Sequence, residues 1–178
     1  MNLRKTLAAA AVLCLGVLSA VALQDEIAVS ASPPTEHHAL LKEYAGKWNA
    51  TTSMMGAEST GTETNAMIGE LWCSTHYVGD FMGTPFEGLG IIGYDPEKQK
   101  YVMSWCDSMT ASMSTGEGTY DKDKKALVME VLDPNTKAIQ THINEFVDDD
   151  TRIFRMLGPV PGSDAPIEYM KVVYKRAK

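Results

Sequence analysis

The stretch QKYVMSWCDSMTASMSTGEGTY, residues 99–120, has the two-residue period that is typical of β-strands. Its first half, residues 99–108, places Tyr101, Met103, Trp105 and Asp107 at every second position. Successive side chains of a strand point to opposite faces, so these residues share one face. In residues 110–120 the corresponding face carries Ala111, Met113, Thr115, Glu117 and Thr119. The stretch predicts two consecutive strands joined by a tight turn.

The period of two continues on both sides of this stretch. We expect strands near residues 47–55, 58–68, 70–79, 84–94, 99–108, 110–120, 125–132, 137–147, 151–157 and 166–175. The segments between them, such as 95–98 (DPEK) and 133–136 (DPNT), carry residues that favour turns. No segment after Tyr44 has the 3.6-residue period that a parallel sheet's crossover helices require. The predicted fold class is therefore all-β and antiparallel.

Strands joined by short hairpins must protect the edges of their sheet. An up-and-down β-barrel of about ten strands does so by closing on itself. A two-sheet sandwich is the alternative, although its long Greek-key connections have no obvious place in this sequence. One helix is expected at residues 36–44, with Thr35 as its N-cap and Gly46 as its stop. It is well placed to cap one end of the barrel, and the predicted domain covers residues 36–178.

The N-terminus has the pattern of a secretory signal peptide. Arg4 and Lys5 precede an apolar run over residues 7–21, and Ala20-Val21-Ala22 supplies small residues for cleavage. The apolar run is short for a membrane span, so an uncleaved anchor is the weaker alternative. We expect a signal peptide at 1–22, a flexible leader at 23–35, and an exported protein in the periplasm or outside the cell.

Composition limits the partners. The chain has 178 residues and a formal net charge of -7, so it lacks the basic face that nucleic-acid binding requires. After cleavage of residues 1–22, no stable membrane span is expected. Nothing in the sequence fixes the oligomeric state.

The alternating faces mix large apolar groups with a few polar ones. If the barrel is hollow, methionine and tryptophan suit an adaptable apolar lining, although both are also common in packed cores. The residues predicted to line such a cavity are Trp48, Trp72, His76, Met103, Trp105, Asp107, Met109, Met113, Glu117 and His142. Among them Asp107, His76 and Glu117 are the polar groups expected to orient a ligand.

Catalytic and metal motifs are weak. The chain has no G-x-S-x-G sequence, and no catalytic residue is assigned. Asp107 is the most interesting acid, with His76 or His142 as its partner in an enzyme. No H-x-x-x-H or C-x-x-C spacing predicts a zinc site, so no metal residues are assigned. Copper(I) held by Met and Cys is chemically reasonable, but no spacing requires it. His37 and His38 are expected to face solvent on the helix.

Cys73 and Cys106 both fall in predicted strands. In an oxidising compartment such a pair can form a disulfide, whereas two buried free thiols fit the same positions equally well.

Four segments resemble a known family: HALLKEYAGKW (38–48), GYDPEKQKYV (93–102), WCDSM (105–109) and EYMKVVYKR (168–176). They are similar to the domain of unknown function 1579, whose members are often exported, and the similarity spans residues 36–176. That family resembles the calycin barrels, which include lipocalins, fatty-acid-binding proteins and nitrobindin. The resemblance implies a ten-stranded antiparallel barrel with an interior pocket, but no activity.

Gly46-Lys47-Trp48 resembles the opening of nitrobindin-like barrels. The haem-ligating histidine expected near the C-terminus is missing from IEYMKVVYKR, which argues against haem. No cofactor is therefore predicted.

Three functions fit these features. The first is an exported barrel that binds a small, largely apolar ligand in its interior. The second is a small barrel enzyme that uses Asp107 with a strand histidine, and the third is a structural or interaction barrel with a closed, packed core. A cavity of about 300 Å³ or more favours the first.

Overall fold

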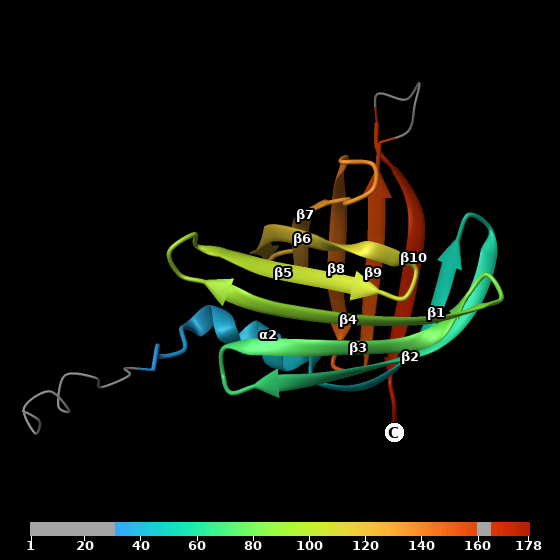
Figure 1. Cartoon of the computed structure of the whole chain (residues 1–178). Coiled ribbons are helices and arrows are strands. Elements are labelled where there is room, and N and C mark those ends of the chain that lie inside the picture. The colour runs from blue at the N-terminus through green and yellow to red at the C-terminus, as the bar shows by residue number, and fades with distance from the viewer. Residues whose placement is uncertain (1–30, 160–164) are drawn as a thin grey trace, which may run out of the picture. The chain divides into compact units, whose positions relative to one another are not determined.

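A computed structural model describes residues 31–159 and 165–178 (Figure 1). The expected signal peptide and most of the leader lie outside the described residues. Within them, the strands are β1 (Gly46–Met54), β2 (Ala57–Ile68), β3 (Trp72–Phe81), β4 (Thr84–Asp95), β5 (Lys100–Asp107), β6 (Thr110–Asp121), β7 (Ala126–Leu132), β8 (Ile139–Asp148), β9 (Thr151–Gly158) and β10 (Ile167–Arg176). All pair antiparallel with their sequence neighbours, and β10 pairs with β1 to close the barrel. The predicted fold class is confirmed.

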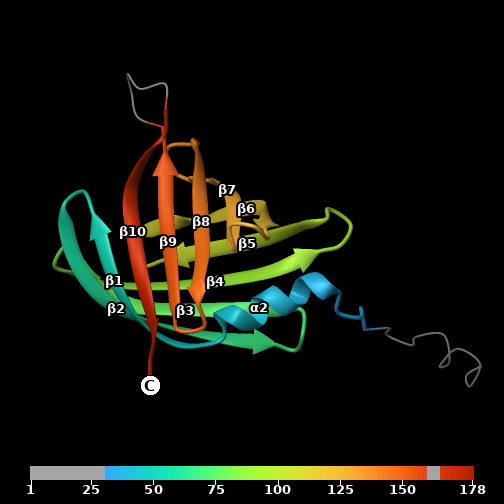
Figure 2. The ribbon, with the colours of Figure 1, turned by 180° about the vertical axis from the view of Figure 1, so that it is seen from behind.

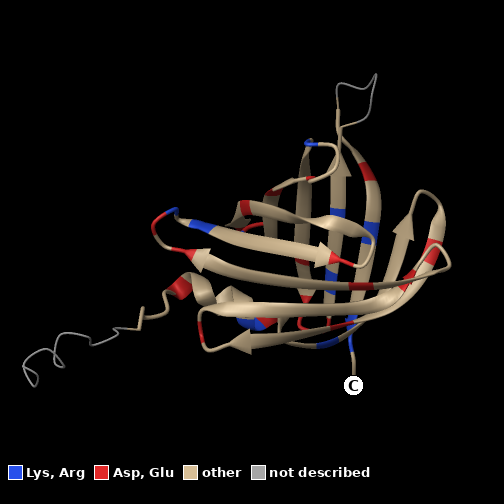
Figure 3. Cartoon of the chain, in the orientation of Figure 1, with Lys and Arg blue, Asp and Glu red and all other residues tan. Residues whose placement is uncertain are grey.

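Aspartates at the strand ends fix the hairpins. At the turn after β4, Oδ1 of Asp95 accepts hydrogen bonds from the backbone N–H groups of Glu97 (2.9 Å) and Lys98 (3.2 Å). Asp121 and Asp133 make the same pair of contacts after β6 and β7. These side chains mimic a backbone turn, so the chain reverses where the sequence predicts. Acidic residues accordingly gather near strand ends in Figure 3.

One short helical segment closes an end of the barrel. It consists of the 3-10 turn η1 (Glu36–His38) and the helix α2 (Ala39–Tyr44). Leu41 and Tyr44 are almost fully buried and pack in one cluster with Cys73 and Leu127. Figure 2 shows α2 beside the end of the barrel where β8 turns into β9. The expectation that the helix caps the barrel is confirmed. No helix of the described residues is long and apolar enough to cross a membrane.

The two histidines of this segment differ from their expected exposure. His38 is buried, and its Nδ1 lies 2.9 Å from the backbone nitrogen of Thr35. His37 is partly exposed, and its ring stacks on Tyr94 at 4.3 Å between centroids. The burial of His38 and the stacking of His37 on Tyr94 arise because the segment lies against the barrel end instead of projecting into solvent.

Candidate ligand-binding cavity

A cavity of about 500 Å³ lies inside the barrel. All ten strands contribute to its wall. The aromatic lining consists of Tyr44, Tyr77, Phe81, Phe86, Trp105, Phe154 and Tyr174, and the methionine lining of Met54, Met103, Met109, Met129, Met156 and Met170. The strands therefore surround a hollow and not a fully packed core, which contradicts the closed-core alternative.

Trp105 lies flat against the cavity wall because β4 has glycines beside it. A Cβ added to Gly88 would come within 2.1 Å of Trp105 Cζ2, and one added to Gly90 within 3.0 Å of its Cε3. The indole Nε1 donates to Oδ2 of Asp107 at 3.0 Å. The ring is thereby held in one orientation with its face toward the cavity.

Asp107 stabilises the turn between β5 and β6. Its Oδ1 accepts from the backbone N–H groups of Met109 and Thr110, each at 2.9 Å, while Oδ2 accepts from Trp105. Both oxygens are therefore engaged, and His142 makes its hydrogen bond to Gln140. The geometry gives the enzyme alternative no support.

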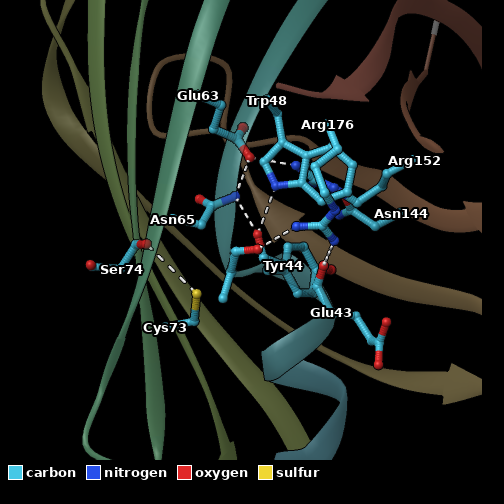
Figure 4. A network of polar contacts seen from close by, with 11 residues as sticks. Glu43, Tyr44, Trp48, Glu63, Asn65, Cys73, Ser74, Asn144, Arg152 and Arg176 are labelled. Carbon is cyan, nitrogen blue, oxygen red and sulfur yellow. Dashed lines mark hydrogen bonds and ion pairs between the residues drawn. The ribbon is translucent and has the colours of Figure 1, made fainter. Parts of the chain in front are cut away.

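A buried ion pair lies at the helix-capped end of the cavity (Figure 4). Arg152 of β9 donates to Oε1 of Glu63 on β2 and, at 2.9 Å, to Oδ1 of Asn144. Arg152 and Glu63 are only 3% and 5% exposed. Asn65 donates to the same Glu63 oxygen (2.7 Å) and to the backbone carbonyl of Tyr44 (3.0 Å). The network ties β2, β8 and β9 to the end of α2.

Aromatic rings enclose the guanidinium of Arg152. Its Cζ lies 4.1 Å from the ring centroid of Tyr174, 4.8 Å from Tyr44 and 5.4 Å from Trp48. Burial first, and then the Glu63 carboxylate, hold the pKa of Tyr174 well above its usual range. Within the described residues, neither Nε of Arg152 nor the hydroxyl of Tyr44 has a hydrogen-bond partner. The ring faces supply part of the compensation that the cation needs.

His142 has a defined tautomer. Asp133 Oδ2 accepts a hydrogen bond from Gln140 Nε2 at 2.9 Å, and a carboxylate can only accept. The Gln140 carbonyl therefore faces His142 Nε2 at 3.1 Å, so Nε2 must donate. The lone pair of the ring lies on Nδ1. Burial lowers the pKa of His142 to about 4, which keeps the ring neutral.

The structure brings about half of the predicted site residues to the cavity. Met103, Trp105, Asp107, Met109 and His142 line it. Trp48 is buried in the adjoining core, where its Nε1 donates to the Tyr44 carbonyl at 2.8 Å.

The other four predictions place residues on the wrong face. Trp72 and His76 point outward because β3 directs Cys73, Thr75 and Tyr77 inward, and His76 pairs with Glu87 at 2.8 Å on the outer surface. Met113 is 59% exposed, and Glu117 pairs outside with Lys98 (3.4 Å) and Lys100. On β6 the inward face is the one that carries Ser114.

Cys73 and Cys106, the cysteines of the described residues, are free thiols. Cys73 is fully buried in the cluster beneath α2, where burial raises its pKa to about 11. Cys106 follows the cavity-lining Trp105 and precedes the cavity-lining Asp107, so it belongs to the outer face of β5. Opposite sides of the barrel wall keep the thiols apart, and the disulfide alternative is not realised.

No group of three or more His, Cys, Asp or Glu side chains in the described part of the chain could hold a metal ion. A second hollow, of about 350 Å³, lies on the surface beside η1 and α2. Its lining mixes Glu36, Glu43, Lys122 and Lys125, whereas the barrel interior is largely apolar. The interior is therefore the better candidate site.

Neither Glu63 nor Arg152 is among the residues predicted from the sequence. Charged residues in strands are normally expected on the solvent face. The sequence signal that could reveal these buried charges is alternation, since Arg152 shares its face with Phe154 and Met156. Glu63 in the same way shares a face with Asn65 and Met67.

The fold and the cavity define this protein as a hollow, closed antiparallel β-barrel. It belongs to the family of proteins of unknown function DUF1579, whose model matches residues 33–176. No curated protein matches the chain in sequence.

Two solved structures share the fold. Rv2717c from M. tuberculosis has 12% identity and a TM-score of 0.57, over 82% of this chain and 100% of that one. The S-type phycobiliprotein lyase CPES from Guillardia theta has 9% identity and a TM-score of 0.54, over 81% and 94%. At these identities the similarity concerns the fold alone.

Proposed function

We propose that the protein binds a small, largely apolar molecule inside the barrel. The observation that carries this proposal is the cavity of about 500 Å³ walled by aromatic rings and methionines. Sites for small molecules typically measure about 300–1,000 Å³ and combine an apolar wall with a few placed polar groups. Methionine adapts its shape to different ligands, while the Trp105 ring offers a fixed flat surface.

The charges of the wall favour a neutral ligand over an anionic one. Among the described lining residues, the carboxylates are Glu63, Asp80, Asp107 and Asp133, whereas the cation is Arg152. Arg152 is already neutralised by Glu63. An anionic headgroup would find no free cation there and would meet carboxylates near the turns that follow β3, β5 and β7.

A pair of matched dyes tests both the site and its charge preference. N-phenyl-1-naphthylamine is neutral, and 1-anilinonaphthalene-8-sulfonate adds a sulfonate to the same ring system. Each dye gains fluorescence when it enters an apolar site, so a titration gives its Kd. We expect the Kd of the neutral dye to be at least tenfold lower than that of the anionic dye. Tighter binding of the anionic dye would overturn the neutral-ligand proposal.

Adjacent residues of β6 provide a matched pair of variants. Ser114 faces the cavity, whereas Met113 is exposed on the outside. Ser114→Trp places an indole inside the hollow, in space that the dye needs, and should abolish binding of the neutral dye, while Met113→Trp should leave it unchanged. Equal binding by the two variants would show that the dye does not occupy the interior.

We also propose that residues 1–22 direct export, as the signal-peptide pattern suggests. Native mass spectrometry of the protein purified from the periplasm of its own host tests this and the ligand together. A mature chain that begins at Leu23 is expected, with a co-purifying small molecule. A chain that retains Met1–Ala22 would contradict cleavage, and a chain without added mass would weigh against a tightly held ligand.

A further inference from the structure

Donor side chains form a continuous row across the inner wall of the barrel. Met129 of β7 pairs in register with His142 of β8, and His142 pairs with Met156 of β9. Met156 in turn pairs with Met170 of β10, and Met170 with Met54 of β1. All five line the cavity. Directly opposite residues of antiparallel strands have Cβ atoms about 4.5–5.5 Å apart, so His142 has a thioether neighbour on each side.

The His142 imidazole in this row is in the tautomer that can bind a metal ion through Nδ1. The Asp133–Gln140–His142 chain places the ring proton on Nε2 and the lone pair on Nδ1. Histidines that bind metals commonly donate their other N–H to a carbonyl or carboxylate, which fixes the ring and raises its basicity. Here Gln140 supplies that carbonyl and Asp133 orients Gln140.

We propose that Nδ1 of His142, with Sγ of Met129 and Met156, binds one soft monovalent metal ion, Cu(I) or Ag(I). Thioether sulfur selects soft ions such as Cu(I), and neutral imidazole is also a good copper ligand. The three ligands carry no charge, which suits a monovalent ion better than a divalent one. Methionine has three rotatable bonds, so sulfurs on strands β7 and β9 can converge in front of the ring between them.

The surroundings compensate the charge of the cation. Asp133 lies behind Gln140, and among the described lining residues the carboxylates outnumber the guanidinium of Arg152. The ring of Phe154 packs edge-on against His142, at 5.2 Å between centroids, and limits its movement. The site does not depend on the proposed organic ligand, since its three ligands lie on one side of the wall, on β7, β8 and β9.

Silver(I) is a suitable probe because it does not change oxidation state. The thiols of Cys14 and of the half-buried Cys106 would compete, so the full chain carrying Cys14→Ala and Cys106→Ala serves as the reference protein. Native mass spectrometry should show one bound Ag(I). Spectra of the ¹³C-methyl groups of methionine should show shifts at Met129 and Met156, and none at the exposed Met82 and Met113.

Variants assign the ligands. In the reference protein, the double change Met129→Leu and Met156→Leu keeps side-chain volume and should weaken Ag(I) binding at least tenfold, as should His142→Gln. The matched control, Met82→Leu with Met113→Leu, should bind Ag(I) as the reference does. Circular dichroism establishes that each variant is folded.

Undiminished Ag(I) binding in the folded Met129/Met156 variant would overturn the proposal. If that variant fails to fold, the methyl spectrum of the reference protein still decides the question. Shifts confined to methionines outside the row, or no binding at all, would also overturn it.

Discussion

At the scale of single residues, the ion pair of Glu63 and Arg152 is the most costly feature of the interior. Transfer of two charges out of water is unfavourable, and the contacts of the pair with Asn65, Asn144 and the rings around Arg152 offset part of that cost. Removal of one partner would leave the other charged and buried. The pair therefore fixes how β2 and β9 face each other across the barrel.

Glu63→Gln should lower the free energy of unfolding by about 3–5 kcal/mol, since it leaves the Arg152 charge uncompensated. Glu145→Gln is the matched control, because Glu145 pairs with Arg155 at 2.6 Å in a partly exposed position. That change should cost less than about 1 kcal/mol. Urea unfolding at pH 7 measures both, and equal costs would refute the role assigned to burial.

His142 should make stability depend on pH. An unfolded histidine takes up a proton near pH 6.5, whereas burial lowers the pKa of folded His142 to about 4. Between these values the unfolded state binds more protons, so the free energy of unfolding falls as pH falls. The full loss from pH 7 to below pH 4 is about 3 kcal/mol. Unfolding curves at pH 7, 5.5 and 4 should show this loss relative to His142→Gln, and parallel pH profiles would contradict it.

At the scale of elements, the packing of the Trp105 ring of β5 depends on the glycines of β4. The small residues Gly88 and Gly90 of β4 leave the space that the Trp105 ring occupies. The alternation of β5 predicts that Trp105 and Met103 share a face. The space that Gly88 and Gly90 leave for the ring becomes apparent only when the pairing of β4 with β5 is known. The sequence of β4 alone does not show which side chain packs on these glycines.

Gly88→Ala should destabilise the protein by about 1–3 kcal/mol, because its Cβ would overlap the Trp105 ring. Gly90→Ala, where the nearest atom would be 3.0 Å away, should cost less. Thermal unfolding measures the difference, and tryptophan fluorescence should report a change around Trp105. A larger cost at Gly90 would show that the ring is not held as described.

Alternation predicts the elements and their two faces, but it does not decide which face is inside. The ten strands follow from turn chemistry and the period of two, and the helical cap follows from its N-cap and stop residues, because these signals are local. On β3, large residues occupy both faces, with Trp72 and His76 outside and Cys73 and Tyr77 inside. The choice depends on the neighbouring strands and on α2, which packs over Cys73. The buried charges of Glu63 and Arg152 escape prediction for the same reason, since each is satisfied by a residue distant in sequence.

At the scale of the whole molecule, the barrel combines a rigid, networked end with a hollow. Leu41 and Tyr44 fill one end, and the hairpin turns after β1, β3, β5 and β7 lie at the other. A molecule bound in the hollow contacts strands from the entire barrel and so binds the folded state alone.

A dye bound in the hollow should therefore raise the free energy of unfolding of the whole barrel. At a neutral-dye concentration of a hundred times its Kd, the free energy of unfolding should rise by about 2.7 kcal/mol. The Ser114→Trp variant should show no such rise. Unfolding in urea with and without dye makes the comparison, and a dye that binds without stabilising the wild-type protein would point to a site outside the folded interior.

The pairing of β1 with β10 also has a consequence for how the protein folds. Trp48 is opposite Arg176, and Arg176 further donates to the backbone carbonyls of Ala45 and Asp149, each at 2.8 Å. Contacts between such distant parts of the chain are slow to form, because much chain entropy is lost before they contribute. During synthesis the barrel cannot close until the segment containing Arg176 has left the ribosome. A molecule enclosed by all ten strands must therefore enter the interior after β10 has been synthesised, whether before or after it pairs with β1.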